Sequence, residues 1–137
     1  MAPPFTHSMR VRYAECDRQG VVFNANYLTY LDQSMTELWR EALGGYQSML
    51  DGGLDMVVVE TTLRYHQPAR FDDVITLEVA VTRLGETSIS TAHRIIRDGE
   101  VLLVASLHHV LVDLETLSKK PLPDWLRSGL EPWVTAE

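Results

Sequence analysis

The sequence contains one long helical pattern, and its other patterns are mostly those of strands. This order of elements limits the folds that the chain can adopt. Apolar residues recur at helical spacing from about residue 24 to residue 43, which indicates an amphipathic helix of about five turns. Asn24 and Asn26 are both suited to cap its first turn. Gly44 and Gly45 follow the last apolar position and stop the helix.

Strand patterns account for most of the remaining chain. Alternating or Val- and Thr-rich runs predict five strands, over residues 7–15, 56–65, 74–83, 87–97 and 100–113. Asp98-Gly99 is a two-residue hairpin signal between the last two strands. The last strand is apolar on both faces over residues 101–105, which predicts cover by the helix on one side and by another subunit or sheet on the other.

The ends of the chain and one connection have their own predictions. Residues 1–6 are expected to be a frayed lead-in, and residues 46–50 a short extra helical turn. Asp124 is expected to cap a short terminal helix that runs to Leu130. One strand, one long helix and four consecutive strands predict a single α+β domain over residues 1–137, with a five-stranded antiparallel sheet and one central helix.

Composition excludes several classes of protein. Lys and Arg number 12 against 19 Asp and Glu, and this formal charge of −7 does not suit nucleic-acid binding. No apolar run approaches the roughly 20 residues that a membrane span needs. Cys16 is the single cysteine, so no intrachain disulfide exists, and a small buried side chain is a better interpretation of it than a nucleophile. The first seven residues do not resemble a signal peptide, and a cytoplasmic location is expected.

The segment Asp17-Arg18-Gln19-Gly20 breaks the first strand just before the helix. A carboxylate at this point lies beside the free N–H groups and the positive dipole end of a helix N-terminus. Asp17 is therefore a candidate base or nucleophile next to an electrophilic site. The alternative is a loop aspartate that satisfies the amides of its own turn, which the turn alone favours.

Other motifs for chemistry are weak. The five histidines are scattered, and His108 and His109 lie in one strand, so their rings point to opposite faces and cannot chelate a metal together. Glycine-rich nucleotide motifs and a serine nucleophile elbow are absent. Asp32 and Glu37 border the polar side of the helix and are interpreted as solvated charges.

Two longer stretches carry a resemblance to a known family. Residues 15–40, ECDRQGVVFNANYLTYLDQSMTELWR, resemble the signature of hotdog-fold acyl-CoA thioesterases of the 4-hydroxybenzoyl-CoA thioesterase/YbgC-like family. Residues 62–88, TLRYHQPARFDDVITLEVAVTRLGETS, resemble the second and third strands of that family and the turn between them. The resemblance implies a hotdog fold, with the sheet wrapped around the central helix. It also implies a homodimer that joins two sheets edge to edge, often a homotetramer, with active sites at the subunit interface.

The resemblance also implies a set of site residues and a substrate. Asp17 matches the catalytic aspartate, as nucleophile or as base for water, and the backbone N–H near Asn24 would polarise the thioester carbonyl. Gly20 matches the turn glycine, and Tyr27 matches a tyrosine packed under the acyl site; a structural role is expected for both. Arg83 is the basic residue nearest the turn where some members bind the phosphates of coenzyme A.

The implied reaction is hydrolysis of an aromatic or short- to medium-chain acyl-CoA, without a cofactor or metal. Asn24 stands where YbgC-like members usually carry histidine, so no side chain there exchanges protons at neutral pH, which argues against a dehydratase. Two alternatives stay open: a non-catalytic module that binds acyl-CoA, and a thioesterase for acyl carrier protein. The sequence does not choose between the nucleophilic and general-base roles of Asp17.

Overall fold

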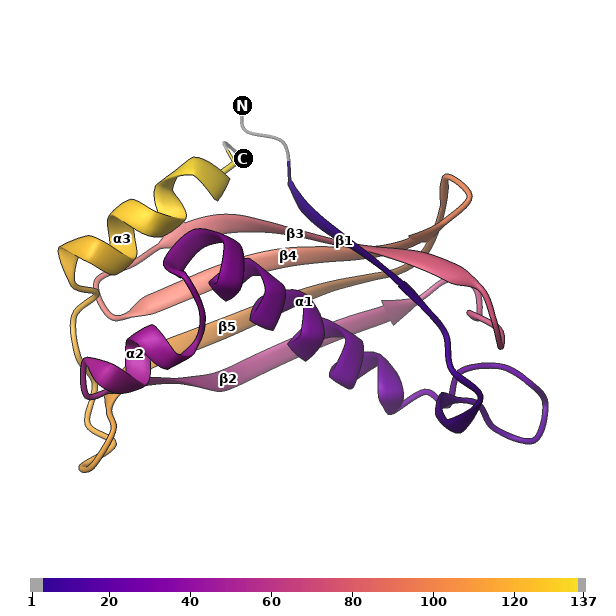
Figure 1. Ribbon diagram of the computed structural model, residues 1–137, viewed down its shortest axis with the longest axis horizontal. Coiled ribbons are helices and arrows are strands. Elements are labelled where there is room, and N and C mark those ends of the chain that lie inside the picture. The colour runs from indigo at the N-terminus through magenta and orange to yellow at the C-terminus, as the bar shows by residue number, and fades with distance from the viewer. Residues whose placement is uncertain (1–3, 136–137) are drawn as a thin grey trace.

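The computed structural model describes residues 4–135, which form a five-stranded antiparallel sheet with a long helix packed across one face (Figure 1). The strands lie in the order β1-β3-β4-β5-β2, so the first two strands of the chain form the two edges of the sheet. The elements are β1 (Phe5–Arg10), α1 (Asn26–Leu43), α2 (Gln47–Asp51), β2 (Leu54–Tyr65), β3 (Val74–Leu84), β4 (Ser88–Arg97), β5 (Glu100–Asp113) and α3 (Asp124–Leu130). This arrangement confirms the predicted α+β class and the sheet around a central helix.

The core lies between α1 and the concave side of the sheet. Alternate residues of β3 point toward the helix, and Ile75, Leu77 and Val79 are buried there. Leu31 and Leu38 on α1 meet them from the other layer and are also buried. The period of two along the strand and the helical spacing on α1 therefore bury the residues that the sequence pattern selects.

The start of helix α1 differs from its prediction. The helix begins at Asn26, and Asn24 and Ala25 form the turn before it. No side chain caps this end, so the capping role predicted for Asn24 and Asn26 is wrong. The predicted stop is confirmed, because Gly44 is the C-cap in the left-handed conformation, with a φ of 81°. The spacing of Leu28 fits the apolar stripe of the helix, but this side chain is 47% exposed.

The first strand is shorter and begins earlier than its pattern predicts. It covers Phe5–Arg10, and the end of the predicted range 7–15 forms a 3-10 turn instead. Residues 1–3 of the expected lead-in lie outside the described residues. Phe5 is not frayed, because it pairs with β3 and its ring packs edge-on against Trp133, with ring centroids 5.5 Å apart. That contact comes from the other end of the chain, so no local pattern can reveal it.

The second half of the chain agrees closely with its predictions. The last strand has the predicted bounds, and β2, β3 and β4 agree to within two residues. The predicted hairpin turn is confirmed, with positive φ values at Asp98 (51°) and Gly99 (78°). Helix α3 begins at Asp124 and follows Pro123 as its N-cap, so Asp124 is the first helical residue and not the cap.

Candidate active site

Asp17 lies at a tight turn between β1 and α1. Its backbone N–H donates to the carbonyl of Val21 (2.8 Å), and its carbonyl accepts the N–H of Gly20 (3.0 Å). Gly20 has a φ of 80°, a left-handed conformation that glycine adopts without strain. The carboxylate oxygen Oδ1 accepts the N–H of Gln19 (2.8 Å), which fits the turn role given above as the alternative. The side chain is nevertheless exposed, and within residues 4–135 its second oxygen has no hydrogen-bond partner.

Asp17 borders a surface hollow of about 380 Å³. The hollow is lined by Tyr13, Ala14, Cys16, Asp17 and Arg18. Burial, and then the charges of Glu15 and Asp17, raise the pKa of the Cys16 thiol. A thiol with a raised pKa is a poor nucleophile. Cys16 packs against the core but is only half-buried, so the predicted buried position is confirmed in part.

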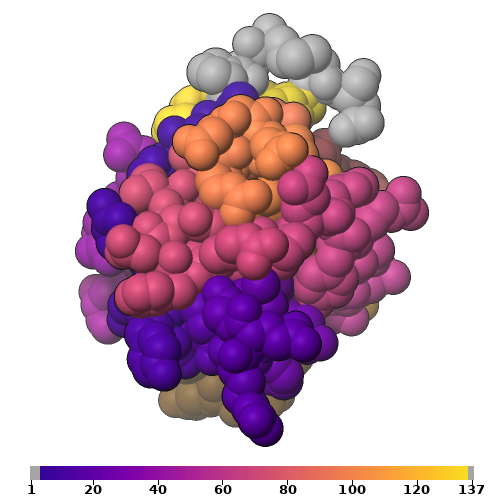
Figure 2. Space-filling view, turned by 90° about the vertical axis from the view of Figure 1, so that its right-hand side faces the viewer, coloured from indigo at the N-terminus to yellow at the C-terminus, as the bar shows by residue number. Residues whose placement is uncertain are grey.

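The Asp17 turn is anchored to the segment between β2 and β3. The N–H of Val22 donates to the carbonyl of Ala69 (2.8 Å), and the N–H of Phe71 donates to the carbonyl of Gly20 (3.1 Å). Tyr27 lies buried beneath this junction, where its hydroxyl accepts the N–H of Ala69 (3.0 Å). Figure 2 shows the two segments packed side by side at this end of the molecule, the indigo chain before α1 against the pink chain after β2. The contacts of Tyr27 are those of a structural support.

The start of α1 offers backbone donors that no atom of residues 4–135 accepts. The N–H groups of Asn24 and Ala25 have no acceptor in this part of the chain. The carbonyl of Asn24, by contrast, accepts the hydroxyl of Tyr65 (3.1 Å), which fixes the turn. The positive end of the helix macrodipole coincides with these open groups. A carbonyl oxygen placed against them would be stabilised as it gains negative charge.

Glu15 ties the Asp17 turn to the start of the helix. Its carbonyl accepts the N–H of Phe23 (3.0 Å) and the side-chain amide of Asn26 (2.8 Å). Its buried carboxylate accepts the backbone N–H of Arg12 (2.8 Å), two guanidinium N–H groups of Arg12 (2.9 and 2.7 Å) and the hydroxyl of Tyr30 (2.8 Å). Burial alone raises the pKa of Glu15, but the hydrogen bonds from Arg12 and Tyr30 outweigh it and keep the pKa below its usual range. The sequence alone predicts no separate role for Glu15.

The structure does not gather the other charged candidates around Asp17. Arg83 lies near the end of β3, whereas the Asp17 turn follows β1, which pairs with the start of β3 at the opposite end of the sheet (Figure 1). Glu37 accepts hydrogen bonds from Gln33 (2.9 Å) and Arg40 (3.1 Å) on the surface of α1. The Glu37 side chain is only 17% exposed, so the solvated charge predicted for this residue is wrong, and Glu37 instead forms a partly buried ion pair.

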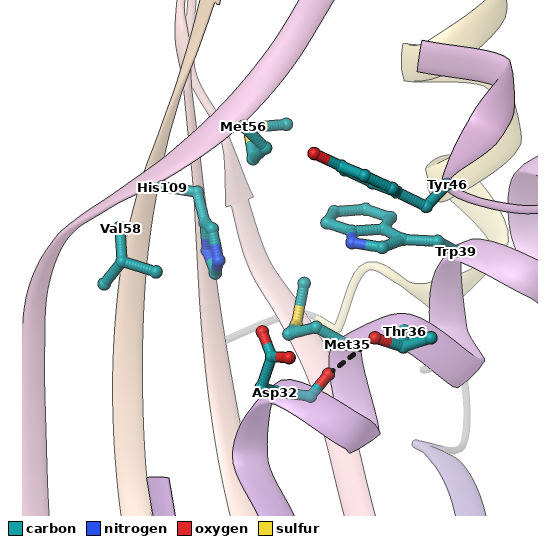
Figure 3. Close-up of a pocket in the computed structure, with 8 residues that line it drawn as sticks. All are labelled: Asp32, Met35, Thr36, Trp39, Tyr46, Met56, Val58 and His109. Carbon is teal, nitrogen blue, oxygen red and sulfur yellow. Dashed lines mark hydrogen bonds between the residues drawn. The ribbon is translucent and has the colours of Figure 1, made fainter. Parts of the chain in front are cut away.

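A second hollow, of about 350 Å³, opens between α1, β2, β5 and the turn before α2 (Figure 3). It is lined by Asp32, Met35, Thr36, Trp39, Tyr46, Met56, Val58 and His109. We call it the helix-side pocket. Asp32 is exposed, as its interpretation as a solvated charge predicts, but it also borders this pocket. The walls of this pocket come from four separate segments, so no local pattern in the sequence indicates it.

His109 is the polar residue most deeply set in the helix-side pocket. It is 6% exposed, its ring lies edge-on to that of Trp39, and its Nδ1 has no hydrogen-bond partner among residues 4–135. Burial, and to a smaller extent His108, lower the pKa of His109 to about 4, so the ring is neutral at physiological pH. His108 faces the other side of the sheet and bonds to Ser90, which confirms that the two rings point apart. The one feature of the sequence that could have indicated this pocket is a histidine on the helix-facing side of an apolar strand.

The sheet around one long helix, with an aspartate turn at the helix start, defines a hotdog fold of the thioesterase kind. A model of the thioesterase-like superfamily matches residues 11–130. The acyl-CoA thioester hydrolase YbgC of Escherichia coli is 29% identical over 117 residues, which cover 85% of this chain and 87% of that protein. A thioesterase superfamily protein from Jannaschia superposes with a TM-score of 0.91 at 23% identity, covering 99% of this chain and 98% of that chain.

A hypothetical protein from Thermus thermophilus is similar at 28% identity, with a TM-score of 0.84 and coverage of 93% of this chain and 98% of that chain. The chain belongs to the thioesterase-like superfamily, which confirms the resemblance seen in residues 15–40 and 62–88. Within residues 4–135, no helix is long and apolar enough to cross a membrane. The same part of the chain holds no cluster of three or more His, Cys, Asp or Glu side chains arranged for a metal ion.

Proposed function

We propose that the protein hydrolyses an acyl-CoA thioester to a free acid and coenzyme A. The observation that carries this proposal is local: one short segment presents the exposed carboxylate of Asp17 and leads into a helix start where the N–H of Asn24 is open. Thioester hydrolysis needs these two elements, a nucleophile or base and a donor for the developing oxyanion. The activity that names the Escherichia coli relative supports the same reaction.

In the proposed reaction, the thioester carbonyl oxygen lies against the N–H of Asn24. A donor of this kind stabilises the transition state by about 3 kcal/mol. Asp17 either attacks the carbonyl carbon or deprotonates the water that attacks it. If Asp17 attacks, the C–S bond breaks as an acyl–Asp17 anhydride forms, and a water then hydrolyses that anhydride; if Asp17 acts as a base, the activated water attacks the thioester directly. On both routes one water is consumed, coenzyme A leaves as a thiolate and takes up a proton, and the acyl group ends as a carboxylate. The amide side chain of Asn24 assists only by orienting water, because it does not exchange protons at neutral pH.

The proposal includes a homodimer joined edge to edge, with a homotetramer as the larger assembly. Strand β2 forms one edge of the sheet and is twice as long as β1, with 12 residues against 6. Val58 and Val59 on this edge are exposed. A long apolar edge strand is a template for pairing with another chain, and a second copy of β2 would satisfy it. Arg83 stays a predicted contact for the coenzyme A phosphates, and its distance from Asp17 within one chain means that this contact would come from a partner subunit.

The test of the proposed function is the variant Asp17→Asn, assayed by thiol release from a panel of aromatic, short-chain and medium-chain acyl-CoA thioesters. The substitution is nearly isosteric and keeps an oxygen that accepts the N–H of Gln19, so the fold should be preserved. It removes both the nucleophile and the base, and we expect turnover to fall by at least roughly 100-fold. The Michaelis constant should change far less.

Asp98→Asn provides the matched control, because Asp98 is an exposed turn aspartate on the β4–β5 hairpin. It should keep full turnover. A folded Asp17→Asn protein that retains most of its turnover would reduce Asp17 to a turn residue. A wild-type protein that binds acyl-CoA but releases no thiol would favour the non-catalytic binding module instead. Release from acyl carrier protein alone would favour the other alternative.

A further inference from the structure

Building on the proposed function, we infer that the helix-side pocket receives the far end of the acyl group and selects an acyl group that ends in an ammonium. The inference concerns specificity, so it names the substrate class of the same site. It rests on where the pocket lies relative to Asn24, on the kind of polar atoms that line it, and on its charge.

The pocket lies along the path that an acyl chain would follow from the helix start. The hydroxyl of Tyr65 bonds to Asn24 at one end of β2, and Met56 and Val58 line the pocket toward the other end of the same strand. Asp32 follows Asn24 by eight residues, which is about 12 Å along a helix. Leu28 lies one turn before Asp32 on the same flank and is exposed, so an apolar side chain lies between the two points.

That separation sets the length of the acyl group. Each pair of C–C bonds of about 1.5 Å at a tetrahedral angle advances an extended chain by about 2.5 Å. A distance of about 12 Å therefore corresponds to roughly ten bonds between the thioester carbon and the terminal group. A medium-chain acyl group reaches the pocket, whereas a short one leaves it empty.

The polar atoms in the pocket are mostly acceptors. The hydroxyl of Thr36 donates its proton to the carbonyl of Asp32 (3.0 Å), and the hydroxyl of Tyr46 donates to the carboxylate of Asp55. The Asp32 carboxylate has neither a hydrogen-bond nor an ion-pair partner in the described part of the chain. His109 is neutral and keeps one lone pair that can accept an N–H. A ligand group that donates several hydrogen bonds complements this lining.

The charge of the pocket is negative. Asp32 borders it and Asp55 lies just behind Tyr46, while no Lys or Arg lines it. Burial, then the hydrogen bond to Asp55 and the charges of Asp55 and Asp32, raise the pKa of Tyr46 to about 12, so this hydroxyl stays protonated and uncharged. His109 cannot supply a positive charge either, since burial keeps it neutral. A cation therefore completes the pocket, and an anion is repelled.

The aromatic rings in the wall favour the same class of ligand. Trp39 and Tyr46 stand next to each other on one side of the pocket, opposite His109 and Val58 (Figure 3). Aromatic faces attract ammonium groups, most strongly where the cation is partly desolvated. An acyl group that ends in a hydroxyl would donate a hydrogen bond to the acceptors but would not balance the negative charge. An acyl group that ends in a methyl would do neither. An ammonium satisfies the acceptors, the carboxylates and the rings together.

The experiment compares four acyl-CoA thioesters that differ only in their terminal group. They are ω-aminodecanoyl-CoA, its methyl isostere undecanoyl-CoA, ω-hydroxydecanoyl-CoA and undecanedioyl-CoA. We expect kcat/KM for the amino compound to exceed that for the methyl isostere by at least about tenfold, with the dicarboxylic compound the poorest. A methyl or hydroxyl compound that is hydrolysed as well as the amino compound would overturn the inference.

A variant ties the preference to the pocket. Asp32→Asn should remove the preference, so that the ratio of kcat/KM for the amino and methyl compounds falls by at least about tenfold. Glu41→Gln is the matched control, because Glu41 is an exposed carboxylate on α1 outside the pocket. It should leave the ratio unchanged. An equal change of the ratio in both variants would mean that general surface charge, and not this pocket, sets the preference.

A binding measurement separates this inference from the proposed function. Titration calorimetry with octylammonium chloride requires no hydrolysis. We expect octylammonium to bind the wild-type protein, octanol to bind more weakly, and Asp32→Asn to weaken octylammonium binding selectively. If no acyl-CoA is hydrolysed but this pattern appears, the proposed function fails and the cation pocket stands. If undecanoyl-CoA is hydrolysed but octylammonium binds no better than octanol, the pocket inference fails and the thioesterase stands.

Discussion

Replacing Tyr30 by phenylalanine tests whether Glu15 holds the Asp17 turn against the helix. The hydroxyl of Tyr30 is buried and donates to Oε1 of Glu15 at 2.8 Å. A hydrogen bond to a charged group contributes roughly 1.5–3 kcal/mol to stability. In the variant, Oε1 of Glu15 still accepts the backbone N–H of Arg12, so this oxygen keeps one hydrogen-bond donor. We therefore expect Tyr30→Phe to lower the free energy of unfolding by an amount near the lower bound, about 1.5–2 kcal/mol.

The pH dependence of stability provides a second test of the contact between Tyr30 and Glu15. The pKa of Glu15 is held below its usual range in the folded protein. The ionised carboxylate therefore stabilises the fold at pH values above the pKa that Glu15 has in the unfolded chain. This stabilisation is lost as the pH falls through the pKa that Glu15 has in the folded protein. The hydrogen bond from Tyr30 is one cause of that lowering, and its loss raises the pKa of Glu15 in the variant. The difference in stability between wild type and Tyr30→Phe should therefore shrink as the pH falls through the carboxyl range.

Urea denaturation at neutral pH and at several acidic pH values measures both effects. Tyr65→Phe is the matched control, because it removes a hydroxyl that donates to an exposed carbonyl at the same end of α1. It should cost less than about 0.5 kcal/mol. The reasoning would be refuted if Tyr30→Phe cost no more than Tyr65→Phe, or if its cost did not depend on pH.

Two further predictions concern the reaction and the assembly. Asn24→Ala keeps the backbone N–H and should retain much of the turnover, whereas Asn24→Pro removes that N–H and should lose most of the rate. Thiol release measures both variants. Equal losses of turnover would mean that the side chain of Asn24, and not its backbone N–H, stabilises the transition state. Light scattering at micromolar protein should give at least a dimer mass, because the exposed edge of β2 needs a partner, and a monomer mass would contradict the composite site.

Local periodicity predicted most of the fold. The clean alternation of Ile75, Leu77 and Val79 in β3 reports a face buried by the helix, and that signal depends only on neighbours in the sequence. The predictions are wrong at positions whose structure depends on contacts between residues far apart in the sequence. Phe5 reads as part of a frayed lead-in because its partner, Trp133, lies at the other end of the chain. Leu28 fits the helical stripe by spacing, yet it lies on a flank that no element of the described chain covers.

The candidate site was predicted only where its residues are contiguous. Asp17, Gly20 and Asn24 fall within one short segment, so the family motif located them together. The helix-side pocket combines Asp32 with His109 and walls from two other segments, and no spacing in the sequence indicates such a meeting. Glu15 was visible as an acid in the motif, but its role depends on Tyr30 reaching back from the helix.

The anchoring of the Asp17 turn also sets the order in which the molecule can be assembled. The β4–β5 hairpin pairs neighbouring segments through a two-residue turn, so it can form early and locally. The Asp17 turn, by contrast, bonds through Val22 to Ala69, and β1 pairs with β3. On a chain that emerges from its N-terminus, the turn therefore has no partner until the segment after β2 has followed. The residues proposed for chemistry are among the first to be synthesised, but they reach their final places only after residues 69–79 have followed them.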